Sequence, residues 1–292
     1  MIAANNALTA SLAPRQRSGY AMGVLQMSMG VGIAIGPLMG GYIADTFGYR
    51  MAFYATAALL LLSGIVVSLW VHETDSRPKE KGQPSPNFLQ EWKNIFASSG
   101  VPITFVLRFL TQMGRMMVFA ILAFFARELL ENENQINSTV GLMMGITSGA
   151  ATLSAVYLGK LGDRIGHRKI LVAATAASGL VYLPQAIVTE AWQLVVLQGL
   201  AGVALGGIIP SIAALLANYT EPGHEGAVYG LDNSINSAGR SLAPLIGGLI
   251  AGWFGMRATF TSTAVLFLAT SAVAYLWLPR VQQPAAEPAP AD

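Results

Sequence analysis

The stretch GIAIGPLMGG, residues 32–41, decides the fold of this chain. It lies inside a long apolar run in which small residues recur at every fourth position: Ser28, Gly32, Gly36, Gly40 and Ala44. An α-helix has about 3.6 residues per turn, so these residues form one smooth ridge along one face of a helix. In lipid, such a ridge lets two helix backbones approach closely. Pro37 lacks a backbone donor, and we expect it to bend the helix at the ridge.

The same pattern occurs a second time near the end of the chain, at Gly239, Ala243, Gly247 and Ala251. The segments GPLMGGYIADTFGYRMAFY (36–54) and APLIGGLIAGWFGMRATFT (243–261) match position by position, so they are two copies of one supersecondary unit. Internal symmetry in an apolar chain is typical of transporters built from two related halves.

These residues resemble the major facilitator superfamily. The pattern from Gly32 to Gly41 is similar to the fifth-helix antiporter signature of the drug–proton efflux members of that family. The resemblance implies a helical bundle in which both copies of the pattern pack against neighbouring helices. The residues assigned to this packing are Gly32, Gly36, Pro37, Gly40, Gly41, Gly239, Pro244, Gly247 and Gly248.

The composition places the chain in a bilayer. Hydrophobic residues make up 53% of it and charged residues only 11%, and the mean hydropathy is +0.53. Soluble domains carry about 25% charged residues. The chain has no cysteine, and its three histidines lie in three separate polar loops, so we expect neither a metal site nor a cofactor. The fold class predicted is an all-α integral membrane protein.

Eight segments are long and apolar enough to span a membrane. Their predicted ranges are 18–44, 49–71, 101–129, 137–160, 168–188, 191–218, 225–253 and 258–279. Residues 1–12 are too short to span and are interpreted as the end of a ninth helix. Lys and Arg concentrate in alternate connections, which predicts a multi-pass protein of the cell (plasma) membrane with its C-terminus in the cytoplasm.

Four parts follow from this division and from the resemblance. Residues 1–71 are the remainder of an N-terminal half, 72–100 a cytoplasmic linker with an amphipathic helix at 87–98, 101–280 a six-helix C-terminal half, and 281–292 a disordered tail. Family members have twelve spans, so the resemblance makes 18–44 the fifth helix and 225–253 the eleventh. It implies that helices one to three and most of helix four are absent, through an internal start at Met1 or because the chain is a fragment. A genuine eight-span protein is the less favoured alternative.

The connection between the spans 137–160 and 168–188 resembles a short cytoplasmic loop of the family. A glycine turn there holds Asp163 at a helix end, where it can pair with neighbouring arginines and form a charge latch that opens during transport. The alternative is a basic turn that only sets the orientation. The latch residues predicted are Gly159, Asp163, Arg164, Gly166, Arg168 and Lys169.

Two spans carry polar stripes. In 101–129, Arg108, Thr111, Gln112 and Arg115 share one face, and Arg115 is near mid-membrane, where an unpaired charge is costly. Its partner is either a carboxylate or an anionic substrate. In 225–253, the spacing of four places Asp232, Asn236 and Arg240 on one face, although Asp232 is close enough to the helix start to act as a cap. We predict that substrate binding or coupling involves Arg108, Gln112, Arg115, Asp232, Asn236 and Arg240.

The function predicted is proton-coupled efflux of small amphipathic compounds by alternating access, and hence multidrug resistance. The alternatives are uptake or exchange of small organic anions and, from another class, a truncated membrane protein that transports nothing. An enzyme is not expected, because the sequence contains no nucleophile–base set, phosphate loop or zinc spacing. The predicted partners are the lipid bilayer, a small-molecule substrate and protons. We expect no nucleic acid, and a monomer if the protein is full length.

Overall fold

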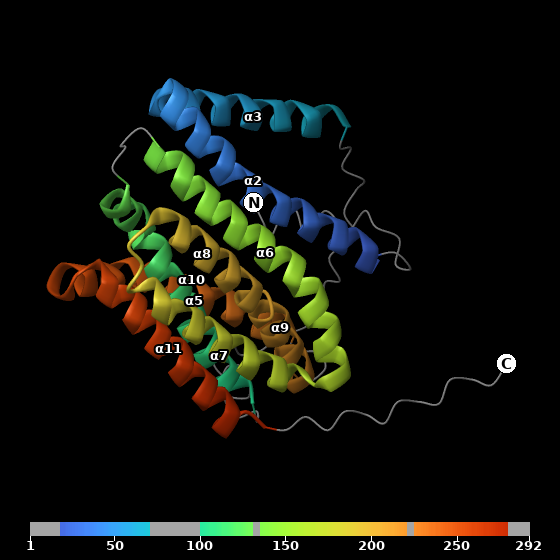
Figure 1. The fold of residues 1–292 in the computed structure, drawn as a ribbon. Helices are drawn as coiled ribbons and strands as arrows, with labels where there is room; N and C mark the ends of the chain where they lie inside the picture. The colour runs from blue at the N-terminus through green and yellow to red at the C-terminus, as the bar shows by residue number, and fades with distance from the viewer. Residues whose placement is uncertain (1–17, 71–99, 131–134, 221–224, 280–292) are drawn as a thin grey trace.

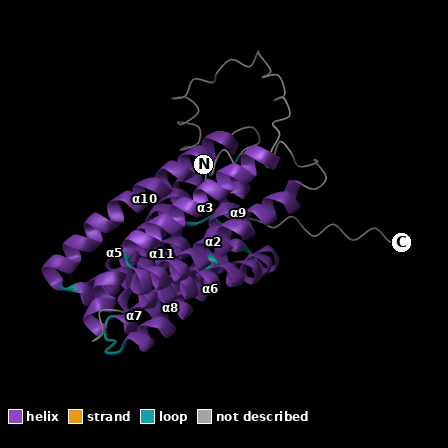
Figure 2. Cartoon of the chain, turned by 90° about the horizontal axis from the view of Figure 1, so that it is seen from above, coloured by secondary structure: helices purple, strands orange, loops and turns teal. Residues whose placement is uncertain are grey.

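The computed structural model describes residues 18–70, 100–130, 135–220 and 225–279. Within these ranges all regular structure is α-helical (Figures 1 and 2). The helices are α2 (Ser18–Phe47), α3 (Tyr49–Trp70), α5 (Val101–Leu129), α6 (Ile136–Ile165), α7 (His167–Gln185), α8 (Ala191–Leu205), α9 (Ile208–Tyr219), α10 (Glu225–Phe254) and α11 (Met256–Trp277). The predicted end of a ninth helix, the amphipathic linker helix and the C-terminal tail lie outside the described residues.

Each predicted span overlaps an observed helix, with two differences. Helix α6 continues to Ile165, beyond the predicted end at 160, and the span predicted at 191–218 is divided into α8 and α9 at Gly206 and Gly207. A Cβ on Gly206 would lie 2.0 Å from Oγ of Ser154 and 2.5 Å from the carbonyl oxygen of Ala151, so only glycine lets this turn approach α6. In the described part of the chain, five segments are long and apolar enough to cross a membrane: Tyr49–Leu69, Val101–Leu129, Ile136–Ile165, Ala191–Tyr219 and Met256–Trp277.

Single glycines make the turns between the paired helices of the repeat. Gly48 connects α2 to α3 with φ +84°, and Gly255 connects α10 to α11 with φ +87°. A side chain is strained in this left-handed region, so glycine is the residue that permits so short a connection. The two turns occupy matching positions in the two sequence copies, and the repeat is therefore structural as well as sequential.

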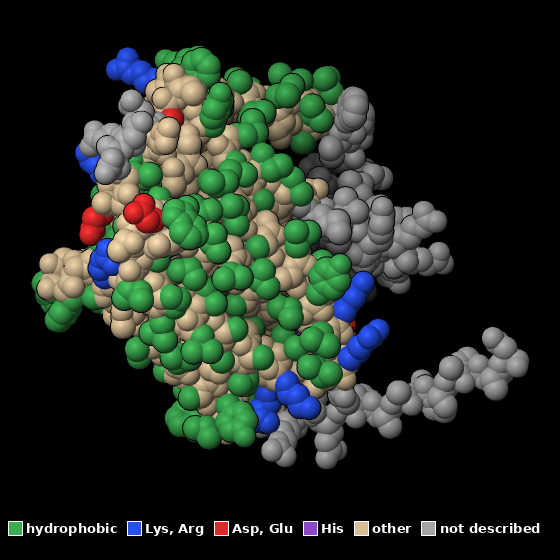
Figure 3. All heavy atoms as spheres, viewed as in Figure 1, with side chains coloured by type: hydrophobic (Ala, Val, Ile, Leu, Met, Phe, Trp, Pro, Cys, Tyr) green, Lys and Arg blue, Asp and Glu red, His purple; other side chains and the backbone are tan. Residues whose placement is uncertain are grey.

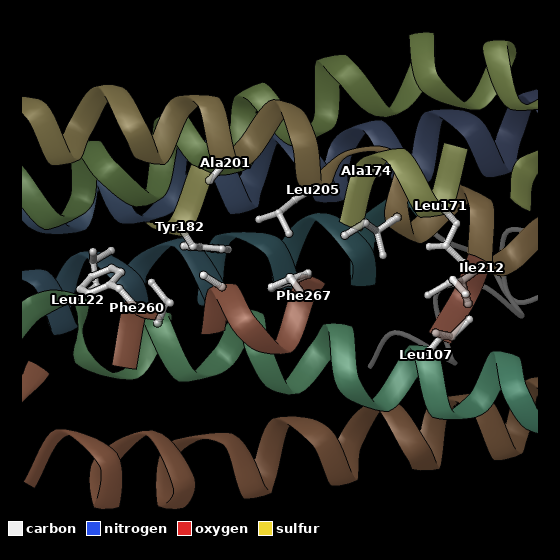
Figure 4. Packing of buried hydrophobic residues seen from close by; sticks show 14 of the residues in the cluster. Leu107, Leu122, Leu171, Ala174, Tyr182, Ala201, Leu205, Ile212, Phe260 and Phe267 are labelled. Carbon is white, nitrogen blue, oxygen red and sulfur yellow. The ribbon is translucent and has the colours of Figure 1, made fainter. Parts of the chain in front are cut away.

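The core lies among α5, α7, α8, α9 and α11 (Figure 4). Tyr182 of α7 stacks on Phe267 of α11 with ring centroids 5.6 Å apart, and Phe125 packs against Phe260 at 5.0 Å. Buried hydroxyl and amide groups add hydrogen bonds between helices, as when Gln198 of α8 donates to Gln185 of α7 at 3.3 Å. In lipid, such packing and such bonds hold helices together because burial of apolar surface contributes little.

Helix α2 lies alongside α6 and joins the first part of the chain to the remaining helices (Figure 1). Helix α3 packs on α2 at the edge of the bundle, and none of its described side chains is fully buried. Figure 3 shows a broad apolar surface with charged side chains gathered toward the two ends of the molecule. This arrangement suits a bundle that crosses a bilayer.

Candidate functional site

An ion pair joins α5 to α10. Nε of Arg108 lies 3.4 Å from Oδ1 of Asp232, and the two side chains are only 17% and 13% exposed. Each residue sits roughly 10 Å from the start of its helix, at 1.5 Å of rise per residue. Neither of these two atoms has a hydrogen-bond partner in the described part of the chain, so the contact is ionic. Asp232 therefore pairs with another helix and does not cap its own.

The polar residues predicted to share one face of α5 differ in how deeply they are buried. Thr111 and Gln112 are buried, while Arg108 and Arg115 are partly exposed. Arg115 lies about half-way along α5, roughly 20 Å from either end. No acidic side chain contacts Arg115 among the described residues. The structure thus pairs Arg108 with Asp232 and gives Arg115 no acidic partner in the described part of the chain.

Of the three residues in the polar stripe predicted on α10, two lie on the face that carries the ion pair. Asp232 and Asn236 are half-buried on the face that carries the ion pair, whereas Arg240 is exposed. The carboxylate of Asp232 contacts Arg108 of α5. Arg108 and Asp232 thus form the centre of the candidate site, and Gln112, Arg115, Asn236 and Arg240 continue the polar surface along the two helices.

The small-residue ridge of α10 packs against α5. Gly239 would place a Cβ 3.1 Å from the carbonyl oxygen of Phe109, and Gly247 would place one 3.3 Å from Cα of Met117. Ala243, between them, is fully buried. Gly248, one residue beyond the ridge, has open space at its Cβ position. This close approach brings Asp232 within reach of Arg108.

On α2 a different face makes the contact. A Cβ on Gly32, Gly36 or Gly40 would meet nothing within 4 Å in the described part of the chain. The adjacent face packs on α6 instead: a Cβ on Gly41 would lie 2.2 Å from the carbonyl oxygen of Asn137, and one on Gly141 would lie 2.3 Å from that of Pro37. Gly41 and Pro37 thus belong to the α2–α6 contact, and the ridge glycines Gly32, Gly36 and Gly40 do not take part in it.

A second polar contact, which sequence reasoning missed, closes one end of the α2–α6 pair. The carboxylate of Asp45 accepts hydrogen bonds from the backbone N–H of Ser138 at 2.6 Å and from the side-chain amide of Asn137 at 2.7 Å. The hydroxyl of Tyr49 donates to Asn137 at 3.0 Å. Ser138 lies in the first turn of α6, so Asp45 caps that helix from outside. Asn137 and Ser138 lie 92 and 93 positions after Asp45 in the sequence, and only the polar type of these residues between apolar runs hinted at a role.

The charge of Asp45 persists at physiological pH. Asp45 lies just beyond the predicted span 18–44. Burial alone would raise its pKa, but the hydrogen bonds from Ser138 and Asn137 outweigh burial and hold the pKa below its ordinary value of 3.8. A depressed pKa stabilises the fold above the unfolded value and loses that effect as pH falls through the folded value. Asp45 is therefore a fixed clamp between α2 and α6, and it does not exchange protons near neutral pH.

We expect the substitution Asp45→Asn to lower the unfolding temperature by roughly 3 °C, because the α6 cap is weakened. The difference from the unmodified protein should stay constant from pH 8 to pH 5 and shrink only below about pH 4. Thermal unfolding in detergent at each pH measures it. Thr46→Val is the matched control, since the hydroxyl of Thr46 donates to the carbonyl oxygen of Tyr42 in its own helix and not to α6 in the described part of the chain. A difference that vanished by pH 5 would contradict the fixed-clamp interpretation.

The predicted latch loop is shorter than expected. Helix α6 continues to Ile165, so Gly159, Asp163 and Arg164 are helical, and Gly166 alone, with φ +101°, separates α6 from α7. The carboxylate of Asp163 lies 2.9 Å from Nε2 of His167. The i, i+4 spacing of this pair was visible in the sequence, but the prediction assigned the partner role to arginines.

Arg168 serves α11. Its guanidinium donates a hydrogen bond to the carbonyl oxygen of Tyr275 and lies 5.9 Å from the centre of that ring. Lys169 is exposed. Of the latch residues, Arg168 thus ties the start of α7 to the end of α11. Whether this turn opens and closes during transport stays a prediction.

The family model described as the Major Facilitator Superfamily matches residues 1–129 and 104–292. A curated protein named "Multidrug resistance protein MdtG" from Dickeya zeae is 35% identical over 275 residues, which is 94% of this chain and 67% of the relative. Proteins of the same name from Escherichia fergusonii and Serratia proteamaculans are 35% and 33% identical, and 66% of each is covered. This chain therefore spans about two thirds of the length of these curated relatives.

Proposed function

Because this chain belongs to the Major Facilitator Superfamily, a family of transporters and not of enzymes, we propose that it exports small amphipathic compounds across the membrane in exchange for protons. The relatives named as multidrug resistance proteins support export as the direction. Alternating access then requires the helices on the two sides of the α2–α6 contact to rock against each other. We place the C-terminus and the α6–α7 turn in the cytoplasm, where basic residues gather in membrane proteins.

The observation that carries the proposal is the pair formed by Arg108 and Asp232. Proton coupling needs a carboxylate that is sequestered in one state and reached by water in another. Asp232 is 13% exposed and stands beside a cation on a different helix. When Asp232 binds a proton, its attraction to Arg108 is lost, and α10 is released from α5. Asp45 does not serve this purpose, because it stays ionised.

Transport measured in everted membrane vesicles tests the proposal. We expect Asp232→Asn to abolish export of a cationic dye driven by a proton gradient, because the amide cannot take up and release the coupling proton. Dye binding to the purified variant should persist. Glu128→Gln is the control, since Glu128 is an exposed carboxylate at the far end of α5. If the Asp232→Asn protein exported dye at the unmodified rate, Asp232 would not be the coupling group.

A second function, uptake or exchange of small organic anions, is favoured by one observation. Arg115 lies at mid-depth without an acidic partner in the described part of the chain, so an anionic substrate would neutralise it. The substitution Arg115→Gln separates the two functions. Under export of cationic compounds, dye transport should remain or increase, because a repulsive charge is removed. Under anion transport, uptake of the anion should be lost.

A further inference from the structure

A cavity of about 960 Å³ opens where α6 ends and α7 begins. Its walls come from four helices: the last turn of α6, the first three turns of α7, the second half of α9 and the end of α11. None of the residues proposed to bind substrate or carry the coupling proton lines it. Figure 3 shows Lys and Arg side chains gathered at the end of the molecule where α6 ends.

The rim of the cavity is basic. His167, Arg168 and Lys169 line it in succession at the start of α7, and the first turn of that helix carries no acidic residue. A helix N-terminus attracts anions through its free N–H groups and its dipole. Two side-chain nitrogens at this helix start are buried: the ring nitrogen Nδ1 of His167 and the guanidinium nitrogen Nε of Arg168. Neither has a hydrogen-bond partner among the described residues. Asp163 also lines the cavity, and its carboxylate lies 2.9 Å from Nε2 of His167, so the rim has three basic side chains and one acidic side chain.

The inner wall of the same cavity is apolar and built from small side chains. Its lining includes Val172, Ala173 and Ala176 of α7 and Ala214 of α9. Small residues on two neighbouring helices leave a groove between them into which a hydrocarbon chain fits. An inorganic anion would occupy only the rim and leave this groove empty. The combination of a basic rim and an apolar groove, at the end of membrane-spanning helices, is typical of sites for lipid head groups.

We propose that this cavity binds one anionic phospholipid, with the phosphate of its head group at Arg168 and Lys169 and an acyl chain along Val172, Ala173 and Ala176. The proposal rests on the proposed orientation, which puts this end of the bundle at the cytoplasmic surface, where anionic lipid is available. A lipid in this position contacts α6, α7, α9 and α11 together and holds their ends in one arrangement.

Native mass spectrometry of the purified protein tests the proposal with phosphatidylglycerol, phosphatidylcholine and inorganic phosphate as separate probes. We expect one phosphatidylglycerol per protein to bind more tightly than phosphatidylcholine. The substitution Lys169→Gln should weaken phosphatidylglycerol binding about fivefold, and Arg168→Gln with Lys169→Gln should weaken it about thirtyfold. Ala176→Leu should also weaken it by filling the groove without changing any charge. Lys160→Gln is the control, because Lys160 is an exposed cation of α6 that does not line the cavity.

Three results would overturn the proposal: equal binding of the two lipids, unchanged phosphatidylglycerol binding in the Lys169→Gln protein, or full displacement of the lipid by inorganic phosphate. Lys169 is exposed, so we expect the Lys169→Gln protein to fold, and it tests the proposal even if the Arg168 variant unfolds. Binding is measured without transport. A failed export assay and a failed lipid assay therefore remain separate results.

Discussion

Replacing Gly141 by leucine should separate α2 from α6. A Cβ at this position would lie 2.3 Å from the carbonyl oxygen of Pro37 and 3.0 Å from its carbonyl carbon. Both are backbone atoms, so no rotamer change relieves the overlap. Overpacking of a close contact costs about 1–3 kcal/mol, and the remaining atoms of leucine add to the clash. We expect the unfolding temperature to fall and dye export to be lost.

An engineered disulfide between α2 and α6 measures directly whether the two helices have separated. The chain has no native cysteine, and an ideal Cβ on Gly30 lies 3.8 Å from Cβ of Thr152, within the range for a disulfide. In the Gly30→Cys, Thr152→Cys protein we expect rapid oxidation to a cross-linked form that migrates differently on a gel. Adding Gly141→Leu should reduce the cross-linked fraction several-fold.

Gly149→Leu is the matched control for that experiment. It makes the same change on the same helix, but a Cβ on Gly149 meets nothing within 4 Å in the described part of the chain. Its cross-linking and unfolding temperature should therefore stay close to those of the starting protein. Equal cross-linking in the Gly141 and Gly149 variants would show that α2 does not pack on α6 through Gly141.

Breaking the Arg108–Asp232 pair from either side should destabilise the protein, and removing both charges should restore it. Arg108→Met or Asp232→Leu alone leaves one largely buried charge without its partner, which costs about 3 kcal/mol. The double variant has no such charge, and two apolar side chains fill the space. We expect its unfolding temperature to approach that of the unmodified protein while proton-driven export stays absent.

Unfolding of the four proteins in a double-mutant cycle measures the coupling. The losses from the two single substitutions should not add, because each removes the same interaction. Arg240→Met serves as the control, since Arg240 is an exposed cation of the same helix α10. Additive losses from Arg108→Met and Asp232→Leu would mean that the two side chains act independently.

Much of the helical architecture was predictable because its causes are local. Length and apolarity identify the spans, and the positive-φ glycines at 48, 166 and 255 lie where the apolar runs pause. The interruption of the span 191–218 was not predictable in this way. It depends on how closely α6 approaches Gly206, and no residue near Gly206 in the sequence reports that approach.

The sequence predicted which residues belong to the candidate site, but it did not predict which of them pair with each other. The helical period places Arg108 and Asp232 on the polar faces of their own helices, and the structure brings these two faces together. Asp163 lies beside His167, a contact that the prediction did not name. The clamp formed by Asp45 was not predicted at all, because its partners come from another helix and one of them is a backbone N–H.

The sequence by itself determined the membrane class, the spans, the repeat and the family resemblance, since these depend on composition and on the periodicity of one helix at a time. Only the tertiary structure decided which face of each helix meets which neighbour. The ridges of α2 and α10 have the same sequence pattern, yet the one on α10 packs on α5 while α2 uses the adjacent face toward α6. A ridge of small residues permits close approach from any helix of matching shape. Its partner is set by the packing of the whole bundle, and that packing is a property of many contacts between distant segments.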